Sequence, residues 1–415
     1  MTPEYDAIVI GGGPSGSTAA ALLAEYGHKV LLLEREPMPR YHIGESLIPY
    51  TWFTLNRLGL VEKMRQSANP KKYSVQFVSI TGKVSQPFYF FQTIKHECSV
   101  TWQVVRSEFD KMLLDNAREK GAEIRQGVSV RDVLMEGSRV VGVRYDEKDG
   151  QKGQEIRAKV VVDASGRDSM LSRKFGWKDR DKDLNKIAVW SYFKGAKRDP
   201  GIDEGATTVA YVPSKGWFWY IPQHSDILSV GVVGEPGYLY RDTRDPDEIF
   251  WREVRACKWV YEKVKDAQQA DVVRVTGEYS YHSKQIGGDG FCLVGDAFAF
   301  LDPLFSTGVF LALKSGEMAA DAIHEGLAAN DLSGARWDAY LQRQRQAVTS
   351  FRSLVCAFYD LTFSFREFLE VYPHLHSSIV DTLVGNVFND LDPLYKALGE
   401  FAKRESRKEM SATTA

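Results

Sequence analysis

The chain has 415 residues, of which 44% are hydrophobic and 26% are charged, and its formal net charge is −2. This length and balance predict a globular protein with two or three packed subdomains, and they argue against nucleic acid as a partner. The four cysteines are scattered, so neither a disulfide framework nor a metal site is expected. An acidic N-terminal stretch and the lack of a membrane-length apolar run predict a cytoplasmic protein without membrane contact.

The first predicted elements form one βαβ unit over residues 6–35, where a strand, a glycine-rich turn, an Ala-rich helix and a second strand follow one another. A second amphipathic helix is expected over residues 106–121, followed by strands that end in an apolar run near residue 163. From about Asp183 to Ser283, alternating aromatic-rich segments predict a sheet. After Gly316 the pattern is helical.

These elements predict a mixed α/β fold with three parts. A Rossmann-like dinucleotide-binding domain is interrupted by an antiparallel β-sheet domain on the substrate side, and a C-terminal helical region covers the molecule as a cap. The predicted boundaries are 1–70, 100–180 and 284–330 for the nucleotide-binding domain, 71–99 and 181–283 for the sheet domain, and 331–415 for the helical cap.

The turn after the first strand carries a nucleotide-binding motif. Gly11, Gly13 and Gly16 fit G-x-G-x-x-G between a strand and a helix, and Glu34 ends the next strand. The first glycine permits a tight turn, the second lets a pyrophosphate approach the backbone, and the third lets helix and strand pack closely. Glu34 is placed to accept hydrogen bonds from ribose hydroxyls. The motif alone does not distinguish NAD from FAD.

The apolar segment over residues 295–313 is interrupted by polar residues where a helix is expected to begin. Asp296 follows a buried strand, and Ser306, Thr307 and Gly308 stand just before the helical pattern. A carboxylate in the first position can hold a sugar-like chain, and the free amides of a helix N-terminus can bind an anion. A simpler alternative is a helix N-cap, in which Ser306 or Thr307 only satisfies amides.

Three segments, EREPMPRYHIGES, VVRSEFD and GDGFCLVGDAFAF, resemble those of the flavin-dependent halogenases, within the FAD-binding aromatic hydroxylase-like superfamily. The resemblance runs from Tyr5 to about Ile323. It implies FAD, used as FADH2, together with O2 and chloride or bromide. The cofactor-binding residues that it implies are Gly11, Gly13, Pro14, Ser15, Gly16, Glu34, Arg35, Arg40, Ile43, Gly44, Glu45, Ser46, Arg106, Val130, Asp296 and Pro303.

The segment GWFWYIP distinguishes halogenases from hydroxylases. Its residues Trp217, Trp219, Ile221 and Pro222 match the halogenase signature W-x-W-x-I-P, which implies that they shield the flavin from water and from direct contact with substrate. An ordinary aromatic strand in a sheet is the alternative.

A second halogenase signature, F-x-x-P-x-x-S-x-G, is matched by Phe300, Pro303, Ser306 and Gly308. The resemblance implies a catalytic role for Ser306 and a halide site at the amides of Thr307 and Gly308, which agrees with the anion-binding interpretation of this helix start.

The lysine pair in NPKKYSVQFVS supplies the remaining candidate. Lys72 lies five residues before Phe77 and matches the family's essential lysine, whose amine holds or carries the oxidised halogen. Desolvation would lower the pKa of such an amine. Lys71 should point to the opposite side if the segment is a strand. Two exposed surface lysines are the alternative.

One departure from the family concerns the residue before Ser306. Tryptophan halogenases carry a glutamate there, whereas this chain has Phe305. The resemblance is therefore to the phenol and pyrrole halogenases, and the base that removes the ring proton is not identified.

We therefore predict a halogenase that acts on an electron-rich aromatic ring, a phenol or a pyrrole, free or tethered to an acyl or peptidyl carrier protein. A separate NAD(P)H flavin reductase is expected because no second nucleotide motif appears. The protein is expected to be a monomer or a homodimer. Three alternatives are a single-component aromatic hydroxylase, a polyprenyl reductase-like flavoprotein and a non-catalytic module that binds a carrier protein.

Overall fold

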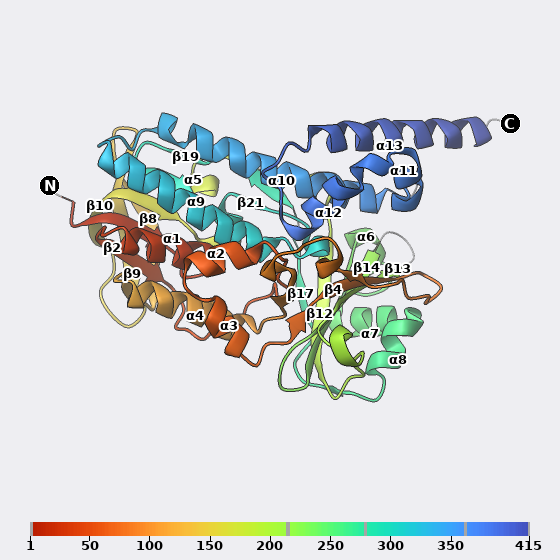
Figure 1. The fold of residues 1–415 in the computed structure, drawn as a ribbon. Coiled ribbons are helices and arrows are strands. Elements are labelled where there is room, and N and C mark those ends of the chain that lie inside the picture. Colours follow the sequence, from red (N-terminus) through yellow and green to blue (C-terminus); the bar gives the residue numbers. More distant parts are fainter. Residues whose placement is uncertain (1–2, 213–215, 278–279, 361–362, 414–415) are drawn as a thin grey trace.

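The computed structural model describes residues 3–212, 216–277, 280–360 and 363–413. Figure 1 shows an elongated molecule with the parallel sheet and its helices at one end, a second sheet at the other, and the C-terminal helices along one side. The predicted mixed α/β fold is confirmed. Across the described ranges, no helix is both long enough and apolar enough to cross a bilayer.

The first sheet has the strand order β19-β20-β10-β1-β2-β7, in which the strands from β20 to β7 are parallel and β19 is antiparallel to β20. Its central strands are almost wholly buried and apolar, as expected for a sheet covered on both faces. The strands are β1 (Tyr5–Ile10), β2 (Val30–Glu34), β7 (Glu123–Gln126), β8 (Val128–Glu136), β9 (Arg139–Glu147), β10 (Gln154–Asp163), β19 (Gly287–Gly288) and β20 (Phe291–Leu293), with β8 and β9 forming an antiparallel extension of β10.

Helix α1 (Pro14–Glu25) connects β1 to β2 and packs against two other helices, α4 (Arg106–Glu119) and α9 (Gly308–Ala328). The βαβ unit and the helix expected over 106–121 are therefore confirmed. This part of the molecule also holds α2 (Thr51–Arg57), α3 (Val61–Gln66) and α5 (Met170–Lys174).

The second sheet has the order β16-β12-β15-β14-β13-β4-β5, with β17 beside β12. It is antiparallel except where β13 and β4 run parallel, because β4 comes from a distant part of the chain. The strands are β4 (Ser74–Val78), β5 (Phe88–Tyr89), β12 (Ile187–Lys194), β13 (Thr207–Val212), β14 (Gly216–Pro222), β15 (Ile227–Gly234), β16 (Gln268–Gln269) and β17 (Arg274–Thr276).

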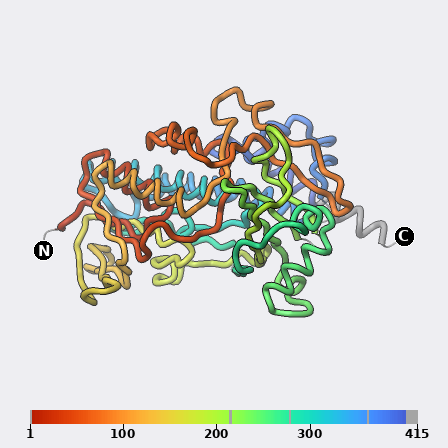
Figure 2. Tube along the Cα trace, turned by 90° about the horizontal axis from the view of Figure 1, so that it is seen from below, coloured from red at the N-terminus to blue at the C-terminus, as the bar shows by residue number. Residues whose placement is uncertain are grey.

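Helices cover the outer face of this sheet, which the strand pattern does not predict. They are α6 (Pro236–Leu239), α7 (Pro246–Ala256) and α8 (Lys258–Val264). The local signal for α7 is clear, because the Asp245 side chain accepts a hydrogen bond from the Glu248 amide and Pro246 occupies the first turn. Strands β13 to β15 thus have one face on these helices and the other toward the first domain (Figure 2).

Two small sheets join the domains. One contains β3 (Lys71–Lys72) and β6 (Thr101–Trp102), and the other contains β11 (Lys178–Arg180), β18 (Tyr281–Ser283) and β21 (Ala299–Phe300). The C-terminal helices are α10 (Asp338–Tyr359), α11 (Phe365–Val371), α12 (His376–Val384) and α13 (Asp392–Thr413), and α10 packs on α9 (Figure 1). The predicted domain boundaries stay an interpretation of this arrangement.

Candidate active site

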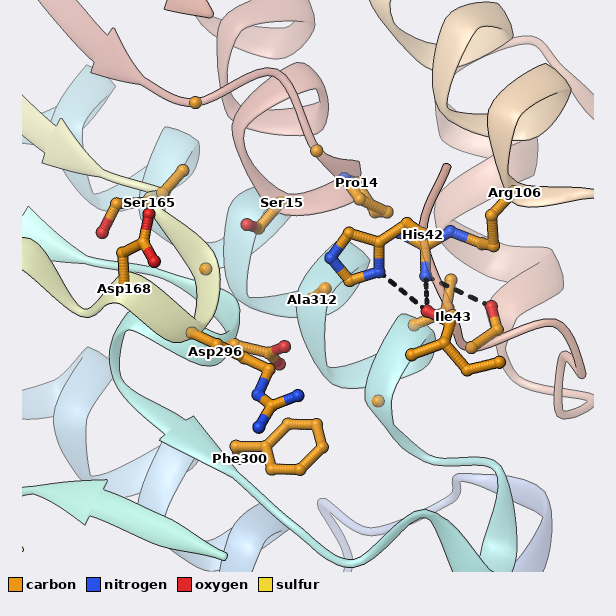
Figure 3. Close-up of a pocket in the computed structure, with 18 of the residues that line it drawn as sticks. Pro14, Ser15, His42, Ile43, Arg106, Ser165, Asp168, Asp296, Phe300 and Ala312 are labelled. Carbon is orange, nitrogen blue, oxygen red and sulfur yellow. Dashed lines mark hydrogen bonds between the residues drawn. The ribbon is translucent and has the colours of Figure 1, made fainter. Parts of the chain in front are cut away.

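A cavity of about 540 Å³ extends from the glycine-rich turn after β1 to the tryptophans of β14. Figure 3 shows side chains from the turn, the loop after β2 and the end of β10 arranged around it. The predicted residues that line it are Gly11, Gly13, Pro14, Ser15, Glu34, Arg35, Arg40, Ile43, Gly44, Glu45, Ser46, Arg106, Val130, Trp217, Trp219, Ile221, Asp296, Pro303, Ser306 and Gly308. The predicted residues outside the lining are Gly16, Lys72, Pro222 and Thr307.

The glycines of the turn lack a side chain for different structural reasons. Gly11 has φ +103°, and a Cβ there would lie 2.4 Å from the Ala164 carbonyl oxygen. A Cβ on Gly16 would lie 2.0 Å from the Gly11 carbonyl oxygen, so this glycine brings helix and strand together. At Gly13 the nearest atom would be a guanidinium nitrogen of Arg40 at 3.6 Å. The turn therefore leaves open backbone at Gly13, where a pyrophosphate would approach the N-terminus of α1.

The carboxylate of Glu34 is fixed by the backbone beside this turn. Its oxygens accept hydrogen bonds from the amides of Gly12 at 2.6 Å and Glu36 at 2.9 Å. Arg40 lies against it, with Nε 3.9 Å from Glu34 Oε1. A buried, oriented acid at the end of the second strand is suited to ribose hydroxyls. Arg35 pairs instead with Asp168.

The loop over residues 40–46 is held by Arg106 at the start of α4. The guanidinium donates to the carbonyl oxygens of Ile43 at 2.6 Å and Gly44 at 3.2 Å, as Figure 3 shows for Ile43. Its other nitrogens donate to both carboxylate oxygens of Asp110, at 2.8 and 2.9 Å. Arg106 therefore lines the cavity, but one of its nitrogens is bound to the loop carbonyls and the other two are bound to Asp110. Asp110, one turn further along α4, was not predicted, although the i, i+4 spacing from Arg106 is its sequence signal.

The carboxyl ends of two parallel strands close the far side of the cavity. Asp296 follows β20, and burial raises the pKa of its carboxyl group to about 6 despite nearby positive charges. Residues after β10 line the same region and were not predicted as site residues: Ala164, Ser165, Gly166, Arg167, Asp168 and Met170. The sequence Asp-Ala-Ser-Gly at the end of a buried strand could have indicated them, because ligands of parallel sheets bind beyond the carboxyl ends of the strands.

Strand β14 presents its aromatic residues to the cavity in alternation. Trp217, Trp219 and Ile221 line the cavity, while Phe218 and Tyr220 pack against the helices on the outer face. By the same alternation Pro222 falls on the outer face, so its predicted shielding position is not supported by the geometry. Glycine is required opposite Trp219, because a Cβ on Gly231 would lie 2.2 Å from the indole ring.

The C-terminal helix α10 reaches the site through Tyr359. Its hydroxyl donates to the buried carboxylate of Asp302 at 2.8 Å and accepts from Trp217 Nε1 at 2.8 Å. Burial raises the pKa of Asp302 to about 6. Nothing local in the sequence marks Tyr359 as a site residue, because the contact depends on how the C-terminal end of α10 packs against the second sheet.

Helix α9 begins at Gly308 without a side-chain cap. Thr307 occupies the N-cap position, and its side chain makes no capping hydrogen bond. Ser306 precedes it with φ +58°, a left-handed conformation that reverses the chain before the helix. A Cβ on Gly308 would meet nothing within 4 Å. The helix N-terminus is therefore uncapped and open on the cavity side at Gly308, an arrangement that favours an anion over a simple N-cap.

Lys72 lies just behind the cavity wall. Its side chain is fully buried, and Nζ donates to Ser46 Oγ at 2.9 Å and to the Leu47 carbonyl oxygen at 3.0 Å. Phe90 covers the amine, with its ring centre 5.6 Å away. Burial lowers the pKa of Lys72 to about 7. Lys71 is exposed on the other side of β3, as strand alternation predicts.

Comparisons with known proteins agree with this geometry. A family model described as "FAD binding domain" matches residues 4–349. The chain is 32% identical over 410 residues to a pyrrole-2-carbonyl peptidyl-carrier protein chlorinase from Pseudomonas fluorescens, over 93% of this chain and 90% of the relative. It is 36% identical over 331 residues to the brominase of the same description from Pseudoalteromonas luteoviolacea, over 79% of each protein. The chain belongs to the FAD-dependent halogenases.

Solved structures of this family have the same fold. A flavin-dependent brominase superposes on the halogenase with a TM-score of 0.86 at 30% identity, over 99% of both chains. The myxobacterial chondrochloren halogenase superposes with a TM-score of 0.80 at 32% identity, over 97% of this chain and 96% of the other.

The halogenase uses FAD, O2 and chloride or bromide, and the residues of the cavity fit the cofactor. The open backbone at Gly13 suits the pyrophosphate, the fixed acid Glu34 suits a ribose, and Trp217 and Trp219 close the opposite end. When bound, FAD supplies the reaction with O2 that makes the halide electrophilic. The residues of the chain would orient the cofactor and exclude water with β14, and a buried amine, Lys72, lies beside the cavity.

Proposed function

We propose that this halogenase chlorinates or brominates a pyrrole-type ring tethered to a peptidyl carrier protein, and that Lys72 passes the oxidised halogen to the ring. The two curated relatives described above are a chlorinase and a brominase of a carrier-bound pyrrole. Their likeness to this chain supports the substrate class.

The burial of Lys72 is the observation that carries the proposal. An amine with no exposed surface, held by Ser46 and Leu47, has lost most of its hydration, and its pKa falls to about 7. A substantial fraction is then neutral near pH 7, so the amine can hydrogen-bond hypohalous acid or become a chloramine. An exposed lysine would stay hydrated and, with the ordinary lysine pKa of 10.5, would be almost wholly protonated at pH 7.

The apolar neighbour of the halide site supports a ring other than the indole of tryptophan. Phe305 packs edge-on against Phe358, with ring centres 6.4 Å apart, and no carboxylate stands at this position. Thr307 and Gly308 would hold the halide at the start of α9, with Ser306 beside it facing the cavity.

A separate NAD(P)H flavin reductase is the expected source of FADH2. The glycines of the sequence VGVVGEPG lie largely in β15 of the second sheet, where Gly231 makes room for Trp219. The short helix α6 follows, but with four residues it is too short to form a dinucleotide site. The single nucleotide motif is thus assigned to FAD.

The test is a reaction with FADH2, O2, halide and three kinds of acceptor: pyrrole-2-carbonyl on a carrier protein, free pyrroles, and free phenols. Mass spectra would identify chlorine or bromine by isotope pattern. We expect halogenated product from the carrier-bound pyrrole. Product from free rings only would contradict the substrate class, and a hydroxylated ring formed without halide would favour the hydroxylase alternative.

A further inference from the structure

Glu45, in the loop that faces the cavity, has one satisfied and one orphaned carboxyl oxygen. Oε1 accepts hydrogen bonds from the Tyr192 hydroxyl at 2.7 Å and from Gln223 Nε2 at 2.7 Å. Oε2 has no hydrogen-bond partner among the described residues, although the side chain is only 3% exposed. The residue lines the flavin cavity. A buried acceptor without a donor is costly, whereas a protonated oxygen would be a donor to whatever occupies the cavity.

Hydrogen bonds continue from Glu45 to the protein surface. The Tyr192 hydroxyl lies 3.0 Å from the hydroxyl of Tyr41, a residue that also lines the cavity and is 43% exposed. Trp190 Nε1 donates to the Tyr41 hydroxyl oxygen at 2.7 Å.

This last bond sets the direction of the chain. An indole N–H can only donate, so Tyr41 accepts from Trp190 and is free to donate its own hydrogen to Tyr192. Tyr192 in turn donates to Glu45. Each donor therefore points from the surface toward the cavity.

We propose that Tyr41, Tyr192 and Glu45 form a proton relay that carries protons from solvent to the flavin cavity. Halogenation of a ring by FADH2, O2 and a halide ion consumes one proton for each halogen incorporated, since two waters are formed. The proposal depends on FAD occupying this cavity, but it does not depend on the identity of the ring.

The transfer balances without any oxidation. The Oε2–H bond of Glu45 breaks and its proton passes to a basic atom in the cavity. Oε1 takes the Tyr192 proton, Tyr192 takes the Tyr41 proton, and Tyr41 takes one from water. Reorientation of the two hydroxyls and the carboxyl group then restores the starting arrangement.

The surroundings of the relay favour a protonated Glu45. Burial raises the pKa of its carboxyl group, against the opposing effects of the Tyr192, Ser229 and Gln223 side chains and the charge of Arg106. The charge of Arg106 is offset by Asp110, which it contacts through two nitrogens. At the outer end, the Arg274 guanidinium lies 4.1 Å from the Tyr41 ring centre and pairs with Asp271 at 2.9 Å.

The test follows hydrogen exchange at Glu45 in the enzyme loaded with oxidised FAD, without halide or substrate. The infrared carbonyl band of the protonated carboxyl group is assigned by its loss in Glu45→Gln, and its shift is timed after transfer to D2O. Tyr192→Phe removes the middle hydroxyl, so the band should shift at least about tenfold more slowly than in the unmodified enzyme. Tyr41→Phe changes a partly exposed residue and should slow the shift as well.

Tyr220→Phe is the matched control. Tyr220 is a buried tyrosine on the outer face of the same sheet, and its hydroxyl donates to the Lys197 carbonyl oxygen, outside the relay. Its substitution should therefore leave the exchange rate at Glu45 unchanged. Equal rates in the unmodified enzyme and in the Tyr192 and Tyr41 variants would overturn the relay. So would the absence of a band that Glu45→Gln removes. Because the measurement needs only bound FAD, failure of the proposed halogenation would not alter its result.

Discussion

Lys72 Nζ and Ser46 Oγ lie 2.9 Å apart, and this hydrogen bond joins the buried amine to the loop that lines the flavin cavity. Ser46 Oγ also lies 2.8 Å from Thr207 Oγ1, which accepts from Gln103 Nε2 at 2.8 Å. The amine therefore contacts the cavity wall through Ser46 without lining the cavity itself. The loop over residues 40–46 thus lines the cavity and also holds Lys72.

The pH dependence of stability should report the buried amine. The pKa of Lys72 is about 7 in the folded protein and 10.5 when the chain is unfolded. Between these values the unfolded chain binds a proton that the folded chain largely lacks. The free energy of unfolding should therefore rise with pH in this window, by up to about 1.4 kcal/mol per pH unit.

Urea titrations of the unmodified protein and of Lys72→Met would isolate this contribution, because other groups titrate in both. As pH rises from about 7 to 10.5, the free energy of unfolding of the unmodified protein should increase relative to that of Lys72→Met. A constant difference across the window would show that Lys72 is solvated and positively charged in the folded state.

Substitution of Gly13 should separate cofactor binding from folding. A Cβ there would meet no protein atom closer than 3.6 Å, and Gly13 lines the cavity, so Gly13→Val should fold normally and lose FAD uptake. Gly16→Val is the contrast, because its side chain would collide with backbone at 2.0 Å and the variant should be destabilised. FAD retention after gel filtration and thermal melting would be compared. Normal uptake of FAD by Gly13→Val would contradict the placement of the pyrophosphate.

The Arg106–Asp110 pair should be important for both stability and cofactor binding. Asp110→Asn leaves the buried guanidinium without a counter-charge and should lower the free energy of unfolding by about 3 kcal/mol. It should also weaken FAD binding, because Arg106 holds the loop at Ile43 and Gly44. Denaturation and flavin fluorescence titrations would measure these effects.

Asp115→Asn serves as its control on the same helix. Asp115 pairs with Lys111 and Arg118 near the surface, and loss of such pairs should cost less than about 1 kcal/mol. Equal destabilisation by the two substitutions would contradict the role assigned to Asp110.

The halide site is tested by Gly308→Ala. The added methyl group has no protein neighbour within 4 Å, so stability should be kept. Crowding at the first turn of α9 should raise the half-saturating chloride or bromide concentration by about tenfold, equivalent to the roughly 1–2 kcal/mol that a helix terminus contributes to binding a charge. Halide titrations at fixed FADH2 would show this. An unchanged half-saturating concentration would place the halide elsewhere.

Sequence periodicity predicted those elements whose signals are local. The βαβ unit and α4 follow from continuous apolar patterns, and the cavity lining from motifs at strand ends. Helices α7 and α8 were not predicted, although Asp245 and Pro246 are a helix-start signal for α7. Pro222 was assigned to the site with its neighbours, whereas alternation along β14 separates them.

Contacts between distant segments explain what the sequence could not predict. Arg106 was expected to contact cofactor directly, but Asp110 and the loop carbonyls take up most of its donors. Tyr359 contacts Asp302 and Trp217 only because the C-terminal end of α10 packs against the second sheet. Phe90 covers Lys72 through packing that no local pattern encodes.

Halogen transfer by Lys72→Met, compared with Lys71→Met, tests the central claim most directly. Each enzyme would be given FADH2, O2, bromide or chloride and carrier-bound pyrrole, and both free hypohalous acid and halogenated pyrrole would be measured. Lys72→Met should still oxidise halide but lose at least about a hundredfold in halogenated product, since only the transfer step lacks its amine. Lys71→Met changes an exposed residue, and its yield of halogenated pyrrole should remain near that of the unmodified enzyme. Full halogenation by Lys72→Met, or its loss in Lys71→Met, would contradict the proposed mechanism.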